Sequence, residues 1–260
     1  GKSAKAGNRN FVHPAVILWH VDRAHLIGKA FDQKLIVQIA AAGIAVYHGC
    51  VIQFFSNPNV FSDVSYVNLG WLSIPISIIW IVAITNAVNF IDGLDGLAVG
   101  VSAISTASLI VIALLVSETN IAMVLIALLG ACLGFIPYNM NPAKIFMGDT
   151  GATFLGYILA TLSITGLFKL YAIISFAVPF LILGVPIFDI CFAFLRRIAK
   201  GQNPMVADRG HVHHRLIDMG FSQKQSVAIA YMLAAILGLA AVLLTSSGEL
   251  RALVLIGAVF

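Results

Sequence analysis

Long apolar runs separated by short polar segments make up most of the chain from residue 35 onward. A helix needs about 20 apolar residues to cross the hydrocarbon core of a bilayer. Seven runs approach that length: 35–55, 71–89, 97–116, 121–138, 151–168, 171–195 and 226–244. An eighth run, 250–260, covers about half of it, so we expect the sequence to end inside a helix. The pattern predicts an all-α integral membrane protein with about eight transmembrane helices.

The composition agrees with this class of protein. Of the 260 residues, 60% are apolar and 10% are charged, whereas a soluble domain carries about 25% charged residues. The net charge of +4 does not indicate a nucleic-acid partner, because the basic residues lie between the spans and form no patch interleaved with aromatic side chains. The three cysteines fall inside apolar runs, so we expect buried small hydrophobes and no disulfides: Cys50, Cys132 and Cys191.

The basic residues also predict the orientation of the chain. Cytoplasmic loops carry an excess of Lys and Arg. If the loops 90–96, 139–150 and 196–225 and the N-terminal segment are cytoplasmic, only Lys169 and Arg251 lie outside. We therefore predict a multi-pass protein of the cell inner (cytoplasmic) membrane, in which residues 35–260 form the transmembrane domain and every unusual polar cluster faces the cytoplasm.

The first polar cluster lies between two predicted spans. It consists of two amides and two carboxylates spaced three residues apart: Asn86, Asn89, Asp92 and Asp95. A glycine follows each of the two aspartates. Unpaired polar groups in hydrocarbon cost several kcal/mol each. The alternative is a polar interhelical loop, for which one Asp would suffice. Because ionisable residues at the end of a span usually mark a site, we favour a functional site.

The second cluster precedes the predicted span at 151–168. Asp149 could cap a helix, or it could join Asn89 as an oxygen ligand of Mg²⁺, which suits carboxylate and amide oxygens and keeps water and phosphate ligands. Phe146 could belong to the core, or it could present an exposed ring on which a base stacks. The residues alone leave both pairs of alternatives open.

The third cluster lies in the longest predicted loop, where His211, His213 and His214 stand between Arg209 and Arg215. Arg binds phosphate oxygens in a bidentate manner, and His can donate to them or carry a proton. A transition-metal site and a loop that binds anionic lipid are the alternatives. Three histidines favour phosphate, because a lipid-binding loop needs only Lys and Arg.

These three segments, 86–100, 146–156 and 211–216, together resemble the polyprenyl-phosphate N-acetylhexosamine-1-phosphate transferases of glycosyltransferase family 4, and within them the bacterial undecaprenyl-phosphate GlcNAc-1-phosphate branch. The resemblance implies transfer of sugar-1-phosphate from a UDP-N-acetylhexosamine to polyprenyl phosphate, with release of UMP and with Mg²⁺, or Mn²⁺ in its place. This would be the first membrane step of a cell-envelope polysaccharide. The muramoyl-pentapeptide branch is the nearest competitor, and a homodimer remains open.

The resemblance also implies residue roles. Asn89 and Asp149 correspond to the metal ligands. Asp95 corresponds to a uridine contact and Phe146 to the ring that stacks on the base. The remaining implied site residues are Asp92, of uncertain role, and the loop that holds the diphosphate and sugar, His211, His213, His214 and Arg215.

The N-terminal segment 1–34 departs from the family. The family has adjacent aspartates before a span, one of them the proposed base for the lipid phosphate, and this chain has no such pair. Asp22 is the best remaining candidate. The family normally has about ten or eleven spans, so we expect this segment to be truncated or rearranged.

Two other classes of protein remain as hypotheses. One is a cation-coupled transporter with Asp92, Asp95 and Asp189 as ion ligands; the acids at span ends and the lack of a sequence repeat disfavour it. The other is a related protein that binds the lipid but has lost its base. Such a protein would bind the UDP-sugar without releasing UMP.

Overall fold

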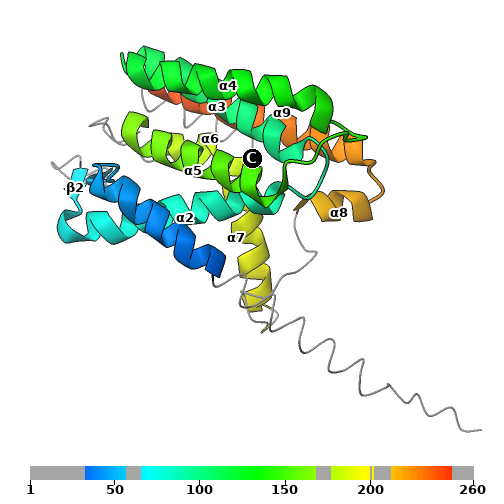
Figure 1. The fold of residues 1–260 in the computed structure, drawn as a ribbon, viewed down its shortest axis with the longest axis horizontal. Coiled ribbons are helices and arrows are strands. Elements are labelled where there is room, and N and C mark those ends of the chain that lie inside the picture. The colour runs from blue at the N-terminus through cyan, green and yellow to red at the C-terminus, as the bar shows by residue number, and fades with distance from the viewer. Residues whose placement is uncertain (1–32, 57–65, 168–176, 200, 202–211, 248–260) are drawn as a thin grey trace, which may run out of the picture. The chain divides into compact units, whose positions relative to one another are not determined.

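The computed structural model describes residues 33–56, 66–167, 177–199, 201 and 212–247. The chain divides into two compact units, residues 1–41 and 42–260. Within the described residues, the first unit contributes only the start of the helix Gln33–Tyr47. The second unit holds all other helices and strands (Figure 1). The predicted half-span 250–260 lies outside the described residues.

The predicted span 35–55 is wrong in its second half. The helix ends at Tyr47, and Gly49 has φ +89°, a conformation that costs glycine little. The chain then extends into strand β1 (Phe54–Ser56), which pairs antiparallel with β2 (Tyr66–Asn68). Aromatic and β-branched residues, which are frequent here, favour strands. Hydropathy alone could not separate this apolar extended segment from a continuing helix.

The first long apolar helices confirm the predicted pattern. The 3₁₀ turn η1 (Gly70–Leu72) leads into α2 (Ser73–Ile91). Pro75 lies in the first turn of α2, where backbone N–H groups have no partner within the helix, so the N–H that proline lacks costs no hydrogen bond. A tight turn follows, and α3 (Leu97–Leu115) begins after Gly96, whose φ of +82° lies in the left-handed region.

The helices α4 (Thr119–Asn139) and α5 (Gly148–Leu167) complete the central part of the unit. α4 packs against α3, and α5 packs against α2 (Figure 1). The second pair approaches closely at Gly156, where an added Cβ would lie 2.7 Å from Cα of Thr85. Trp80 also donates from Nε1 to Oγ of Ser163 across this pair, at 3.1 Å. These contacts fix α5 against α2, and with it the residues at the start of α5.

The region predicted as one span at 171–195 is not one helix. Its described part contains the short helix α6 (Ala177–Ile182) and the helix α7 (Gly184–Ala199). Pro186 has no N–H to donate to the last carbonyl of α6, which lies four residues earlier. The hydroxyl of Ser105 on α3 donates to that carbonyl at 2.8 Å instead. The sequence signal for this break was Pro186, two residues after Gly184.

The last two described helices are α8 (Val212–Asp218) and α9 (Gln223–Ser247). α9 packs against α3 and α6. A Cβ added at Gly238 would lie 2.2 Å from Oγ of Ser108, so glycine permits the close approach of α9 to α3. α8 lies within the region predicted as the loop 196–225, which therefore contains a helix.

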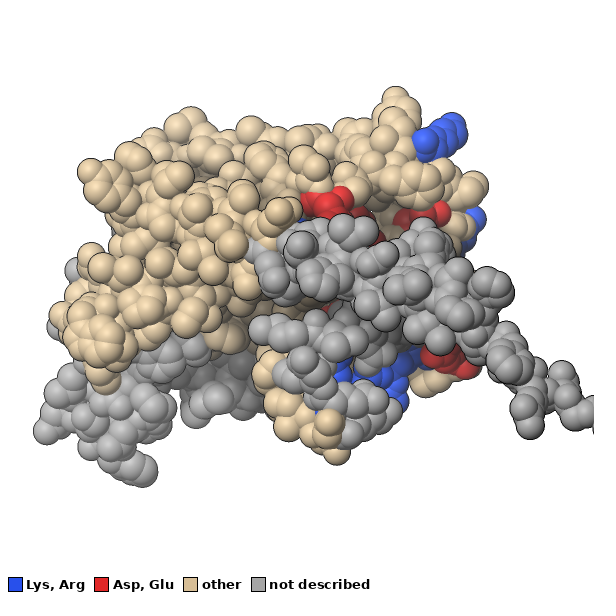
Figure 2. Space-filling view, turned by 60° about the horizontal axis from the view of Figure 1, so that its bottom comes forward, with Lys and Arg blue, Asp and Glu red and all other residues tan. Residues whose placement is uncertain are grey.

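Four helices in the described part of the chain are long and apolar enough to cross a membrane: Gly70–Ile91, Leu97–Leu115, Thr119–Asn139 and Gln223–Ser246. They coincide with four of the eight expected spans. α5 is also long, but its first turn is polar. Figure 2 shows a broad uncharged area beside the region where charged side chains gather. The protein is an all-α integral membrane protein, and the short hairpin is a minor addition to it.

Candidate active site

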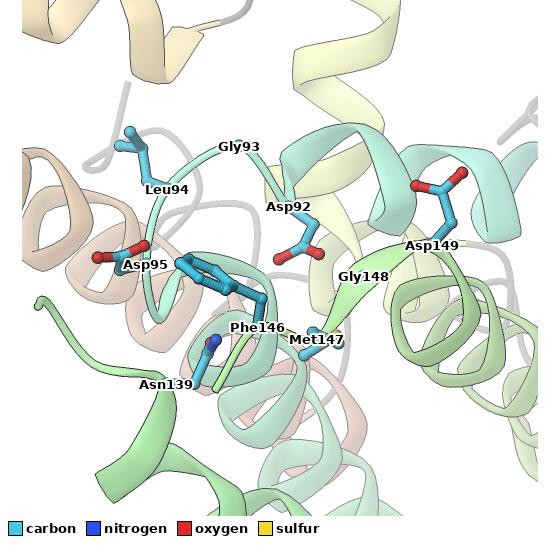
Figure 3. A pocket seen from close by; sticks show the side chains of 9 residues that line it. All are labelled: Asp92, Gly93, Leu94, Asp95, Asn139, Phe146, Met147, Gly148 and Asp149. Carbon is cyan, nitrogen blue, oxygen red and sulfur yellow. The ribbon is translucent and has the colours of Figure 1, made fainter. Parts of the chain in front are cut away.

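The polar segments from different parts of the sequence meet at one end of the second unit. Successive helices from α2 to α5 are joined by short turns and alternate in direction, so α2 and α4 end where α3 and α5 begin. These ends surround a pocket of about 260 Å³. It is lined by residues 92–95 from the turn after α2, the last residue of α4, and residues 146–149 at the start of α5 (Figure 3).

One of the predicted metal ligands, Asp149, lines one half of the pocket, and the other, Asn89, lies in contact with it. Asn89 on α2 donates from Nδ2 to Oδ1 of Asp149 on α5, at 3.3 Å. The prediction that these side chains, sixty positions apart, would meet is confirmed. Asp149 lies in the first turn of α5, where a negative charge is favoured by the helix dipole. Their role as metal ligands stays a prediction.

The donor set in this half fits Mg²⁺. A half-turn of the Asn89 amide exchanges Nδ2 for Oδ1 and brings two oxygens together. Neighbouring ligands of an octahedral ion at 2.0–2.1 Å lie about 2.9 Å apart, close to the separation of these two atoms. In the described residues, no three His, Cys, Asp or Glu side chains form a metal-binding group. Two or three oxygen ligands with room for water and phosphate suit Mg²⁺ better than zinc.

Asp92 lies beside this pair. It follows the last residue of α2, and its carboxylate points into the pocket between Asp95 and Asp149 in Figure 3. Within the described part of the chain, its carboxylate accepts no hydrogen bond. Burial, and after it the negative charge of Asp149, raise the pKa of Asp92 from 3.8 to about 6. This half of the pocket therefore concentrates negative charge that a divalent cation would neutralise.

The other half of the pocket contains Asp95, in different surroundings. Its Oδ2 accepts the backbone N–H of Ala143 at 3.1 Å and Nδ2 of Asn141 at 3.0 Å. The amide of Asn141 also donates to Oε1 of Gln223 at the start of α9, at 2.8 Å. Asp95 thus joins the turn after α2 to the turn after α4. Its predicted contact with uridine stays a prediction.

A second set of bonds holds the same turns. Asn139, 3% exposed, accepts the N–H of Gly96 at 3.1 Å and donates to the carbonyl of Ile145 at 2.9 Å. The hydroxyl of Tyr231 on α9 donates to the carbonyl of Gly96 at 2.6 Å. Gly100 leaves the space for this ring, because an added Cβ would overlap the phenol. The amides of Asn139 and Asn141 lie within the predicted loop 139–150, but only the fold reveals their partners.

Phe146 projects at the mouth of the pocket, with 74% of its surface exposed. In Figure 3 its ring lies between Asp95 and Asp92. The alternative that Phe146 belongs to the core is wrong. A large apolar ring kept at the surface of a polar pocket is available to stack on a planar ligand.

The third predicted cluster is described in part. Asp22 and His211 lie outside the described residues. His213 and His214 belong to the backbone of α8. The guanidinium of Arg215 lies 5.1 Å from the ring centroid of Phe192 on α7, a cation–π contact. The predicted roles of these residues stay predictions.

The fold and the site together define a class of protein: a helical membrane protein with a pocket at its helix ends that suits a cation. Residues 24–167 match the protein family described as glycosyl transferase family 4. The match covers more than half of the chain, and the chain belongs to this family.

Curated relatives have more specific names. The chain is 42% identical to the probable undecaprenyl-phosphate N-acetylglucosaminyl 1-phosphate transferase of Bacillus subtilis (strain 168), over 82% of this chain and 59% of that protein. It is 33% identical to the decaprenyl-phosphate N-acetylglucosaminephosphotransferase of Mycobacterium leprae (strain TN), over 76% of this chain and 54% of that protein. It is 34% identical to the phospho-N-acetylmuramoyl-pentapeptide-transferase of Staphylococcus aureus (strain JH9), over 82% of this chain and 65% of that protein. The chain thus spans little more than half to two thirds of these relatives.

Proposed function

We propose that this chain forms the catalytic part of an enzyme that transfers N-acetylglucosamine-1-phosphate from UDP-N-acetylglucosamine to a polyprenyl phosphate, releasing UMP in the presence of Mg²⁺. The single observation that carries this proposal is the contact between Asn89 and Asp149 at the edge of the pocket that Asp149 and Asp92 line. The names of the two relatives that act on N-acetylglucosamine and a polyprenyl phosphate support the choice of substrates.

In this proposal Asn89 and Asp149 hold Mg²⁺ in the pocket. The ion would neutralise charge on the diphosphate oxygens, which is the main requirement of phosphoryl transfer. Asp92 faces the same space, where its carboxylate would attract the ion. Phe146 provides a surface on which uracil stacks.

The proposed reaction exchanges one phosphorus–oxygen bond for another. An oxygen of the lipid phosphate forms a bond to the phosphorus that carries the sugar, and the bond from that phosphorus to the UMP oxygen breaks. The leaving UMP keeps the electron pair. The basic segment around Arg215 suits the negative charge of the diphosphate and of the departing nucleotide. All these groups would act at the cytoplasmic face of the inner membrane, where nucleotide sugars are available.

The direct test measures transfer of labelled sugar phosphate from UDP-N-acetylglucosamine to polyprenyl phosphate. It uses membranes that contain the full-length protein. We expect a labelled lipid product and one UMP per product, both lost when Mg²⁺ is chelated and restored by Mg²⁺ or Mn²⁺. Binding of the UDP-sugar without UMP release would instead support the non-catalytic alternative, and a protein that forms no product contradicts the proposal.

The choice of sugar is tested in the same assay. UDP-N-acetylmuramoyl-pentapeptide replaces UDP-N-acetylglucosamine as donor, because the Staphylococcus aureus relative is named for that transfer. We expect turnover of UDP-N-acetylglucosamine alone. Turnover of the pentapeptide donor alone would assign the chain to the competing branch.

The transporter hypothesis gains no support from the geometry. Two of its three proposed ion ligands, Asp95 and Asp189, accept backbone N–H groups at 3.1 and 2.6 Å and so hold neighbouring segments in place. Flux of substrate into proteoliposomes would be needed to revive it.

A further inference from the structure

Asp189 is a carboxylate inside α7 that the proposed reaction does not use. Its residue is 3% exposed. Its Oδ1 accepts the backbone N–H of Val212, the first residue of α8, at 2.6 Å. The first N–H groups of a helix have no partner within it, and a hydrogen bond to a carboxylate is among the strong ones. This buried carboxylate therefore holds one end of α8.

The helix α8 depends on such contacts. It has seven residues, and isolated helices of this length do not persist in water. Its C-terminal end is held by the turn into α9, where Phe221 donates its N–H to the carbonyl of Leu216 at 3.1 Å. Its N-terminal end is held by Asp189. Both ends of the short helix are thus fixed to longer ones.

A second contact joins the same two helices. Phe192 lies one turn after Asp189 on α7, and its ring is 5.1 Å from the guanidinium carbon of Arg215. The Phe192 ring also stacks on Phe188, with centroids 6.5 Å apart. α7 therefore orients both the backbone of α8 and the side chain of its arginine.

We propose that Asp189 is a positioning residue for donor binding: it fixes the start of α8, and through it the position of Arg215 and of the two histidines that α8 contains. This inference rests on the proposed function, because it takes α8 to contact the diphosphate of the nucleotide sugar. In this proposal Asp189 acts through α8 and not by contact with the donor or the lipid. Its removal should loosen α8 and weaken donor binding while leaving the fold in place.

The first measurement uses hydrogen exchange, followed by mass spectrometry, of the purified protein in detergent. Asp189→Leu should speed exchange in the peptide containing residues 212–218 by about tenfold or more, because a charge-assisted bond is lost. Asp189→Asn should remain close to the wild type, since its amide oxygen still accepts. Phe194→Ala is the matched control on α7, because Phe194 is 45% exposed. Unchanged exchange in Asp189→Leu overturns the proposal.

The second measurement compares steady-state constants for the same variants. Asp189→Leu should raise KM for UDP-N-acetylglucosamine by about tenfold with a smaller change in kcat, and Asp189→Asn should restore most of the affinity. Phe192→Ala, which removes the second contact, should raise KM in the same direction. A purely structural role would lower the yield of folded enzyme at unchanged KM, and that result overturns the proposal even if exchange increases. A wild-type protein without transfer activity defeats the proposed function separately, because the exchange measurement needs no turnover.

Discussion

Asp92 and Asp95 are three residues apart in one glycine-containing turn, yet their carboxylates have different surroundings in the two halves of the pocket. Asp95 accepts a backbone N–H and an amide N–H, and so joins two turns. Asp92 accepts no hydrogen bond from the described residues and has a pKa raised by burial and by Asp149. Asp95 thus helps to hold two turns together, whereas Asp92 faces the carboxylate of Asp149 across the pocket.

The difference teaches that sequence spacing identifies a site without assigning its roles. The spacing of three residues marked Asn86, Asn89, Asp92 and Asp95 as one candidate site, but it did not distinguish their roles. In the structure the helix ends at Ile91. Asp92 and Asp95 therefore lie in the turn after it, where their side chains have different neighbours. The donors that reach Asp95 come from the turn after α4, which no local pattern places there.

The largest effect should follow from changing the metal half. Asn89→Ala and Asp149→Ala should each lower transfer activity by more than about 100-fold, the cost typical of removing one group that stabilises developing charge. The measurement is labelled transfer in membranes at saturating Mg²⁺. Asn86→Ala is the matched control: Asn86 lies on the same helix, but its amide donates to the carbonyl of Val82 at 2.8 Å. Full activity in both site variants would defeat the assignment of the metal half.

Phe146→Ala should have the next largest effect, on affinity. Stacking of a base on an aromatic ring contributes about 1–3 kcal/mol, so we expect KM for the UDP-sugar to rise between about 5-fold and 150-fold with a small change in kcat. Phe154→Ala provides the control, since Phe154 is also exposed but lies farther along α5 and away from the pocket. Equal changes in both variants would contradict a stacking role.

Changes in the half of the pocket that contains Asp95 should lower the stability of the protein. Asp95→Ala leaves the N–H of Ala143 and the amide of Asn141 without this acceptor, which should lower the free energy of unfolding by about 1–3 kcal/mol. Thermal unfolding in detergent measures it. Glu118→Ala is the control, because the Glu118 side chain makes no capping bond at the start of α4. A rise in KM at unchanged stability would instead assign Asp95 to the substrate alone.

The smallest effect concerns pH. The pKa of Asp92 is raised in the folded state, so this state binds a proton more tightly than the unfolded one between pH 3.8 and about 6. Stability contributed by Asp92 is therefore present at low pH and is lost as pH rises through that window. With a chelator present, Asp92→Asn should become more stable than the wild type as the pH rises through it. A stability difference that does not vary with pH would contradict the unpaired state of this carboxylate.

Much of the fold could be predicted because lipid-crossing helices need only length and hydropathy. The helices α2, α3, α4 and α9 follow from their apolar runs. The prediction failed where an apolar run does not form a single continuous helix. Gly49 lies between the end of one helix and an extended segment. Pro186, in the first turn of α7, cannot donate to the last carbonyl of α6.

The site was predicted to a similar degree. Asn89 and Asp149 meet as expected, since each stood at the end of an apolar run. Asn141 and Tyr231 could not be recognised, because amides near a proline and a tyrosine in an apolar helix are common. Their function as hydrogen-bond donors to Asp95 and Gly96 depends on contacts between helices far apart in the sequence.

The most direct measurement of the central claim is a titration of the purified protein with Mn²⁺, followed by electron paramagnetic resonance. The account predicts one tightly bound Mn²⁺ per chain, displaced by Mg²⁺, lost in Asn89→Ala and Asp149→Ala and retained in Asn86→Ala. Equal binding by all four proteins would contradict it, because the two side chains that meet across α2 and α5 would then hold no ion.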